Sequence, residues 1–235
     1  MIKIKTYRNE WKYQITNQEL SLLKSRISKV LEIDSHIKEN DRYYIHSLYF
    51  YDNKDTSVYT TSSGLSNRYK WRIRYYDDDL SYIVLEKKIK KESRCHKKSC
   101  LITIDEYDCI VNGNITELVY DTNKDLIKEL ARDILLFNYR PKVIIDYDRI
   151  AYVEEVTNVR ITFDMHISAS YDLEHFLDRD YTRFYLLPSH INLLEVKFDK
   201  ILPSYIRHIV ESYNFKQTSF SKYYYGRCLL DNFLR

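Results

Sequence analysis

The sequence predicts an α+β protein built on a mostly antiparallel sheet, and three observations support this prediction. Many segments are rich in β-branched and aromatic residues and have the composition of strands. Fewer segments place apolar residues at helical spacing. No stretch rich in Pro, Gly and Ser divides the 235 residues, so we expect one domain over residues 1–235.

The strand-like segments occur at intervals along most of the chain. Each is enriched in Val, Ile, Tyr, Phe, Trp or Thr, which fit a pleated and half-buried surface. The predicted strands are residues 2–15, 43–51, 69–76, 82–89, 99–107, 142–152, 159–167 and 193–198.

Two helices are predicted in the first two thirds of the chain. Thr16 followed by Glu19 forms a capping box, and apolar residues then recur at helical spacing. A second helix is predicted over residues 125–137, where one stripe is apolar. We expect it to end before Pro141, because proline cannot continue a helix.

Two further helices are predicted near the C-terminus. One follows Pro203, where apolar residues again recur at helical spacing. Residues 221–235 are predicted as a terminal helix, although Gly226 is a poor helix former.

The composition excludes several nucleotide-binding and catalytic motifs. The 3 glycines, Gly64, Gly113 and Gly226, lie far apart, so they cannot form a P-loop, a dinucleotide fingerprint, a kinase glycine loop or a hydrolase elbow. The net charge is +3, so bulk charge does not indicate nucleic-acid binding. If the protein handles phosphates, it must therefore do so with side chains.

Targeting signals and metal motifs are also missing from the sequence. The 4 cysteines show no zinc spacing, so we expect reduced thiols. The first residues contain no apolar segment typical of a secretion signal, and no window is long and apolar enough to span a bilayer. A cytoplasmic location is therefore the expectation.

Charged side chains repeat on one face of the predicted strands. Successive strand residues point to opposite faces, and over residues 69–75 the even positions are cationic while the odd positions are aromatic or apolar. The same separation recurs in four further segments. The polar faces carry Glu10 and Lys12; Lys70, Arg72 and Arg74; Glu86, Lys88 and Lys90; Arg160, Thr162 and Asp164; and Glu195 and Lys197.

Two interpretations of these faces remain open. An ordinary antiparallel sheet also exposes one polar face to water. If the sheet closes into a barrel, however, the cations crowd in its lumen, where their repulsion favours an anionic guest. Paired arginines suit phosphate oxygens, and Glu195 is a hard oxygen ligand for Mg²⁺ or Mn²⁺. The pattern thus favours a multi-phosphate ligand with a divalent metal.

At these residues the chain resembles the VTC domain, the polyphosphate-polymerase branch of the triphosphate tunnel metalloenzymes. The most specific segment is Arg68-x-Lys70-x-Arg72-Ile73-Arg74-x-Tyr76. One departure is Tyr51, which precedes Asp52 where the family usually has Asp directly. The other matching segments are Arg8-x-Glu10-x-Lys12-Tyr13, Ser47-Leu48-Tyr49-Phe50, Leu85-Glu86-x-Lys88, Asp146-Tyr147-x-Arg149-x-Ala151, Val159-Arg160-Ile161-Thr162-Phe163-Asp164, Leu194-Glu195-Val196-Lys197-Phe198 and Ser221-Lys222-Tyr223.

The resemblance implies an eight-stranded antiparallel tunnel that transfers the terminal phosphoryl group of ATP to inorganic polyphosphate with Mn²⁺ or Mg²⁺. The terminal helix would close one tunnel mouth. The resemblance, together with the polar strand faces for Lys70 and Lys197, implies these site residues: Arg72, Arg74, Arg149, Arg160 and Lys222 in catalysis, Lys12, Lys70, Lys88, Lys97 and Lys197 in substrate binding, and Glu195 as the metal ligand.

Several alternatives stay open at this point. Lys98 competes with Lys97 for the tunnel-facing position, and the basic run 87–98 is expected to form a mobile, solvated hairpin. Glu10 and Glu86 are either further metal ligands or, as we expect, ion-pair partners of nearby cations.

The function itself also has alternatives. Arg8 stands where the cyclase and thiamine-triphosphatase branch has Glu, which favours the polymerase branch. A tripolyphosphate or nucleoside-triphosphate hydrolase and a non-enzymatic polyphosphate-binding module are the alternatives. No nucleic-acid partner is expected, and a membrane exporter would have to be a separate protein.

Overall fold

The structure is a computed structural model that describes residues 7–37, 41–65, 67–92 and 94–233. Residues 2–6 of the first predicted strand lie outside the described residues. The strands are β1 (Arg8–Thr16), β2 (Glu32–Ile33), β3 (Tyr43–Tyr51), β4 (Arg68–Tyr76), β5 (Asp79–Lys91), β6 (Arg94–Ile102), β7 (Arg140–Glu154), β8 (Val159–Ser170), β9 (Phe184–Tyr185) and β10 (Ile191–Phe198). The helices are α1 (Asn17–Ile27), α2 (Thr56–Ser62), α3 (Ile104–Val111), α4 (Ile115–Asp121), α5 (Asp125–Phe137), α6 (Ser204–Glu211) and α7 (Lys222–Phe233).

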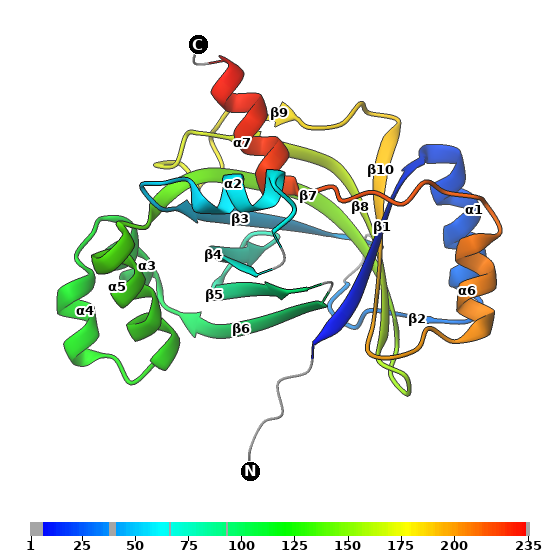
Figure 1. Ribbon diagram of the computed structural model, residues 1–235, viewed down its shortest axis with the longest axis horizontal. Coiled ribbons are helices and arrows are strands. Elements are labelled where there is room, and N and C mark those ends of the chain that lie inside the picture. The colour runs from blue at the N-terminus through cyan, green and yellow to red at the C-terminus, as the bar shows by residue number, and fades with distance from the viewer. Residues whose placement is uncertain (1–6, 38–40, 66, 93, 234–235) are drawn as a thin grey trace.

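Eight of the strands form a closed antiparallel barrel, as the sequence predicts. Their order is β7-β3-β4-β5-β6-β1-β10-β8, and pairing of β8 with β7 completes the circle (Figure 1). Among the described residues, β1 joins β6 through the pairs Arg8–Cys95 and Asn9–Arg94. The short strands β2 and β9 extend the sheet beside β7 and β8.

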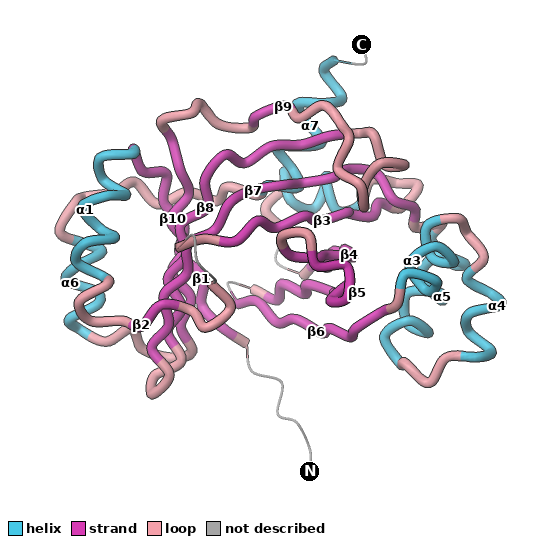
Figure 2. The backbone as a smooth tube through the Cα atoms, turned by 180° about the vertical axis from the view of Figure 1, so that it is seen from behind, coloured by secondary structure: helices cyan, strands magenta, loops and turns pink. Residues whose placement is uncertain are grey.

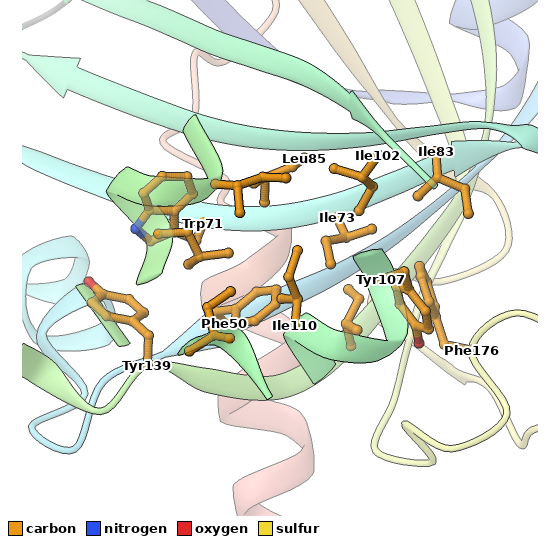
Figure 3. Close-up of a cluster of buried hydrophobic side chains, with 14 of the residues drawn as sticks. Phe50, Trp71, Ile73, Ile83, Leu85, Ile102, Tyr107, Ile110, Tyr139 and Phe176 are labelled. Atoms are coloured by element: carbon orange, nitrogen blue, oxygen red, sulfur yellow. The ribbon is translucent and has the colours of Figure 1, made fainter. Parts of the chain in front are cut away.

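Two groups of helices cover the barrel from outside. Figure 2 shows α1 and α6 on one side and α3, α4 and α5 on the other. The first group packs on apolar residues of β1, β8 and β10, including Ile161 and Val196. The second group packs on β4, β5 and β6, where Trp71, Ile73 and Leu85 are fully buried (Figure 3). Burial of each such side chain stabilises the fold by about 1.5–3 kcal/mol.

Helix α7 packs against β7 and β8 and confirms the predicted terminal helix. Gly226 explains how it approaches so closely. A Cβ atom at this position would lie 2.5 Å from Ile145 Cδ1 and 3.2 Å from Ala169 Cβ. The glycine that weakens the helix signal in the sequence is therefore what allows the helix to pack on the strands.

The predicted strand over residues 99–107 is wrong in its second half. Strand β6 ends at Ile102, and Thr103 is the N-cap of α3. The Thr103 hydroxyl accepts a hydrogen bond from Glu106 N, and Glu106 Oε2 accepts one from Thr103 N. This capping box overrides the strand-like composition of the segment.

Helix α5 ends before Pro141, as predicted, but proline is not the reason that it ends. Asn138 ends the helix in the left-handed conformation, with φ 55° and ψ 47°. Pro141 lies within β7, beside the register shift between Tyr49 and Phe50 of β3. A proline is tolerated at such an irregularity because the ladder there lacks a regular hydrogen bond.

The basic run 87–98 forms the hairpin predicted from the sequence, but several of its lysines are in ion pairs instead of being solvated. It belongs to β5 and β6, which pair from Ile83–Ile102 to Lys91–Arg94. Lys87 Nζ lies 2.9 Å from Asp133 Oδ2, and Lys98 Nζ lies 2.6 Å from Glu129 Oε2. These outward lysines therefore anchor α5 to the sheet.

Candidate functional site

The barrel encloses a cavity of about 1440 Å³ whose wall is strongly cationic. Strand β4 illustrates how the wall is built, because its alternate residues from Arg68 to Tyr76 all line the cavity. The lining cations are Arg8, Lys12, Arg68, Lys70, Arg72, Arg74, Lys88, Lys90, Lys97, Arg149, Arg160, Lys197 and Lys222. The lining carboxylates are Glu10, Asp77, Asp79 and Glu195.

The structure brings every sequence-predicted site residue to this cavity. The two adjacent lysines are separated by the strand alternation, because Lys97 lines the cavity whereas Lys98 faces α5. The predicted residues found there are Lys12, Lys70, Arg72, Arg74, Lys88, Lys97, Arg149, Arg160, Glu195, Lys197 and Lys222.

Glu195 on β10 is surrounded by four cations. Its Oε2 lies 2.9 Å from Lys197 Nζ and 3.6 Å from Arg149 Nη2. Its Oε1 lies 3.2 Å from Lys222 Nζ and 3.5 Å from Lys12 Nζ. Burial opposes ionisation, but these positive charges outweigh it and hold the pKa of Glu195 well below its usual 4.5.

Asp164 on β8 is a second buried carboxylate beside Glu195. It accepts two hydrogen bonds from Arg149, at 2.6 and 2.7 Å, and one from Lys222 Nζ at 2.5 Å. Burial raises its pKa, and the two cations more than reverse that effect. Asp164 lies on a polar strand face in the sequence, but no role was predicted for it.

Glu86 and Glu10 are ion-pair partners of the tunnel cations, as expected. Glu86 Oε2 lies 2.6 Å from Arg72 Nε, and its Oε1 lies 2.5 Å from Lys97 Nζ. Glu10 Oε1 lies 3.2 Å from Lys88 Nζ. For both carboxyls, nearby positive charges overcome the effect of burial and lower the pKa.

Tyrosine hydroxyls accept hydrogen bonds from three of the tunnel arginines. These contacts were not predicted from the sequence. Arg72 donates to the Tyr49 hydroxyl at 2.8 Å, and Arg74 donates to the Tyr147 hydroxyl at 3.0 Å. Arg160 donates to Tyr43 at 3.0 Å. Strand alternation places Tyr43 and Tyr49 on one face of β3, and both line the cavity, but which arginine each one contacts depends on how the strands pair.

Lys70 is a cation without a carboxylate within 4 Å among the described residues. Its Nζ donates to Ser221 Oγ at 3.2 Å and lies 4.6 Å from the centre of the Tyr223 ring. Burial, followed by the charges of Arg68 and Lys88, lowers its pKa well below 10.5. An anion in the tunnel would relieve this repulsion.

The segment before α7 crosses the tunnel wall at β1. Thr218 N donates to Lys12 O at 2.8 Å, and Lys12 Nζ donates to Phe220 O at 3.0 Å. Lys222 then begins α7 and reaches Asp164 and Glu195. The terminal helix therefore contributes a cation to the site, as predicted.

The donor set fits a divalent metal that arrives together with phosphate oxygens. Among the described residues, no group of three or more His, Cys, Asp or Glu side chains could hold a metal ion by itself. Mg²⁺ commonly takes one or two carboxylates and completes its shell with water and substrate phosphates. Glu195 provides such a carboxylate, and the cations around it would hold the phosphates.

A family model of the VTC domain matches residues 7–231. The chain belongs to the VTC domain family. A search among curated proteins finds no match.

Solved structures resemble this VTC domain at low sequence identity. A Bacillus halodurans protein described as a candidate adenylate cyclase has a TM-score of 0.50 at 13% identity, covering 91% of this chain and 95% of that one. A protein from Pyrococcus horikoshii OT3 has a TM-score of 0.46 at 15% identity, covering 96% and 99%. The first match supports the tunnel fold. Over the part of the VTC domain that the structure describes, no helix is long and apolar enough to cross a bilayer.

Proposed function

We propose that this VTC domain is a polyphosphate polymerase that transfers the terminal phosphoryl group of ATP to a growing inorganic polyphosphate chain. The observation that carries the proposal is the row of cations along β4, from Arg74 through Arg72 and Lys70 to Arg68, inside one cavity. A row of this kind binds consecutive phosphates and not a single one.

The size of the cavity supports a reaction with two substrates. A drug-sized ligand occupies a pocket of about 300–1,000 Å³, whereas this cavity measures about 1440 Å³. A phosphoryl donor and a phosphate-chain acceptor can therefore lie end to end.

In phosphoryl transfer, the protein mainly positions the two substrates and neutralises the negative charge of the phosphate oxygens. A terminal oxygen of the acceptor chain attacks the γ-phosphorus, the bond from that phosphorus to the β,γ-bridging oxygen breaks, and ADP leaves. The attacking oxygen is already anionic, so no general base is needed. Arg72, Arg74 and Arg149 orient the phosphates and neutralise the charge that develops on them. Glu195 would hold Mn²⁺ or Mg²⁺, which would neutralise further charge on the phosphate oxygens.

Three carboxylates of the tunnel are poorly suited to activate water for hydrolysis. A hydrolase needs a base that removes a proton from water, and a base works best with a pKa near the working pH. The pKa values of Glu10, Glu86 and Glu195 are all lowered by nearby cations. These carboxylates are therefore weak bases.

The test is an assay of products from ATP with Mn²⁺ or Mg²⁺, with and without a short polyphosphate primer. We expect a longer polymer with one ADP for each phosphate added. Arg74→Ala should lose most activity while remaining folded in a thermal melt, with a stability loss of about 1–3 kcal/mol because Arg74 is buried and donates to Ser47 and Tyr147. Free phosphate without polymer would assign a hydrolase, and binding without turnover would assign a binding module.

A further inference from the structure

Three tyrosines of the tunnel wall contact one another where β4 turns into β5. The Tyr43 and Tyr76 ring centres lie 5.8 Å apart at an angle of 66°, and the Tyr76 and Tyr82 centres lie 6.2 Å apart at 45°. All three residues line the cavity. Tyr82 is 46% exposed although it lies on the cavity wall, so its ring offers an open aromatic surface there.

These tyrosines lie next to the arginines that we propose bind phosphate. Tyr76 is two residues beyond Arg74 on β4, which corresponds to about 7 Å along a strand. Burial raises the pKa of Tyr76, but the charges of Arg74 and Lys97 more than reverse this. Tyr43 accepts a hydrogen bond from Arg160. A ligand with phosphates on the arginines would therefore place its next group on the tyrosines.

The charge at this end of the cavity is mixed, because carboxylates lie there together with the cations Arg160 and Lys97. Asp77 and Asp79 line the cavity beside the tyrosines, together with Ser81. Carboxylates repel phosphate oxygens, whereas they accept hydrogen bonds from the amino groups of a nucleobase. Around Lys70, in contrast, the neighbouring charges are those of Arg68, Lys88, Lys12 and Lys90.

We propose that Tyr43, Tyr76 and Tyr82 form a nucleobase subsite. The phosphoryl donor is then a nucleoside triphosphate whose base stacks on Tyr76 and Tyr82, while the inorganic chain occupies the end of the tunnel near Lys70. Stacking on an aromatic side chain is favourable for every base because each has a π-face. The inference rests on the proposed function for the direction of transfer, but its test is one of binding.

The experiment compares ATP with inorganic tripolyphosphate, which carries the phosphates but no base. Calorimetric titration of wild type, Tyr82→Ala and Tyr82→Leu gives the dissociation constants. We expect both variants to bind ATP about tenfold more weakly and tripolyphosphate within about twofold of the wild type. Tyr82→Trp should retain ATP binding. Tyr44→Ala is the matched control, because Tyr44 is 47% exposed on the same barrel but does not line the cavity.

Two results would overturn the subsite: unchanged ATP binding by Tyr82→Ala, or equal losses for ATP and tripolyphosphate. Thermal melting of each variant checks that it is folded, and Tyr82→Leu keeps apolar volume if Tyr82→Ala melts early. Failure of the proposed function can be distinguished from failure of the subsite. If no polymer forms, the protein can still bind ATP through Tyr82. Polymer formation with no role for Tyr82 would remove the subsite alone.

Discussion

Lys222 Nζ, at the first residue of α7, lies 3.2 Å from Oε1 of Glu195 on β10. The same amine lies 2.5 Å from Asp164 Oδ2 on β8. The C-terminal helix and the tunnel wall are thus joined by one charged cluster. A metal that binds Glu195 must displace Lys222, and a phosphate must compete with Glu195 for the Lys222 amine, so ligand binding is coupled to the position of α7.

Glu195→Gln should separate anion binding from metal-dependent turnover. We expect ATP turnover with Mn²⁺ to fall at least about 100-fold, since removal of a single charge-stabilising group commonly costs that much. Tripolyphosphate without metal should bind several-fold tighter, because one negative charge facing it is gone. The free protein should lose about 1–3 kcal/mol of stability, since four cations each lose one carboxylate contact, although Arg149 and Lys222 keep Asp164 and Lys197 keeps Glu10. Titration in EDTA and thermal melting check this, and full metal-dependent turnover would contradict the assignment.

Lys97 and Lys98 form a matched pair for mutation, because they are adjacent but face opposite sides of β6. Lys97→Ala should weaken tripolyphosphate binding about tenfold, which corresponds to about 1.4 kcal/mol. Lys98→Ala should leave that affinity unchanged, because Lys98 pairs with Glu129 on α5. Its stability should fall by at most about 1 kcal/mol. If the two substitutions changed the affinity equally, Lys97 would not be a phosphate-binding residue of the tunnel.

Lys70→Met should stabilise the free protein and weaken its binding to polyphosphate. Lys70 faces several like charges and its pKa is lowered, so charging it opposes folding. We expect a gain of up to about 1 kcal/mol, which is the usual scale of a single substitution, because a charge penalised by burial and by like charges is removed. Denaturant unfolding with and without polyphosphate measures both effects. A less stable variant with unchanged affinity would show that Lys70 serves packing alone.

Stability of the free protein should fall on acidification below about pH 4.5. The pKa values of Glu10, Glu86 and Glu195 are lowered from the usual 4.5. Between the lowered values and 4.5, the unfolded chain binds more protons than the folded one, so acid favours unfolding. The stabilisation is complete above that range and is lost as pH falls through the folded values. Melting temperatures from pH 7 to pH 3 check this, and a curve flat below pH 4.5 would contradict it.

The tunnel wall was predictable because alternation is a local property of a strand. Lys70, Arg72 and Arg74 share one face of β4 whatever the neighbouring strands do. Whether Lys97 or Lys98 faces inward was harder, because it depends on the register of β6 against β5, where Lys88 pairs with Lys97. Register follows from pairing between strands and not from the composition of one of them.

Other features depend on contacts that are distant in the sequence. Tyr43 and Tyr147 read as ordinary apolar strand residues, and only closure of the barrel places their hydroxyls on Arg160 and Arg74. Gly226 reads as a helix-weakening residue, while its contact with Ile145 requires the helix to be docked. In contrast, the capping box of Thr103 and Glu106 is a local sequence signal. The strand predicted over residues 99–107 did not take it into account.

Transfer of the terminal phosphoryl group to polyphosphate can be measured directly with ATP that is labelled at the γ position. The protein would be incubated with labelled ATP, Mn²⁺ and a short polyphosphate primer, and the products would be separated by length. If the protein is a polyphosphate polymerase, the label will appear in lengthened polymer, with one ADP for each labelled phosphate incorporated. Label released as free phosphate, with the primer unchanged, would contradict it.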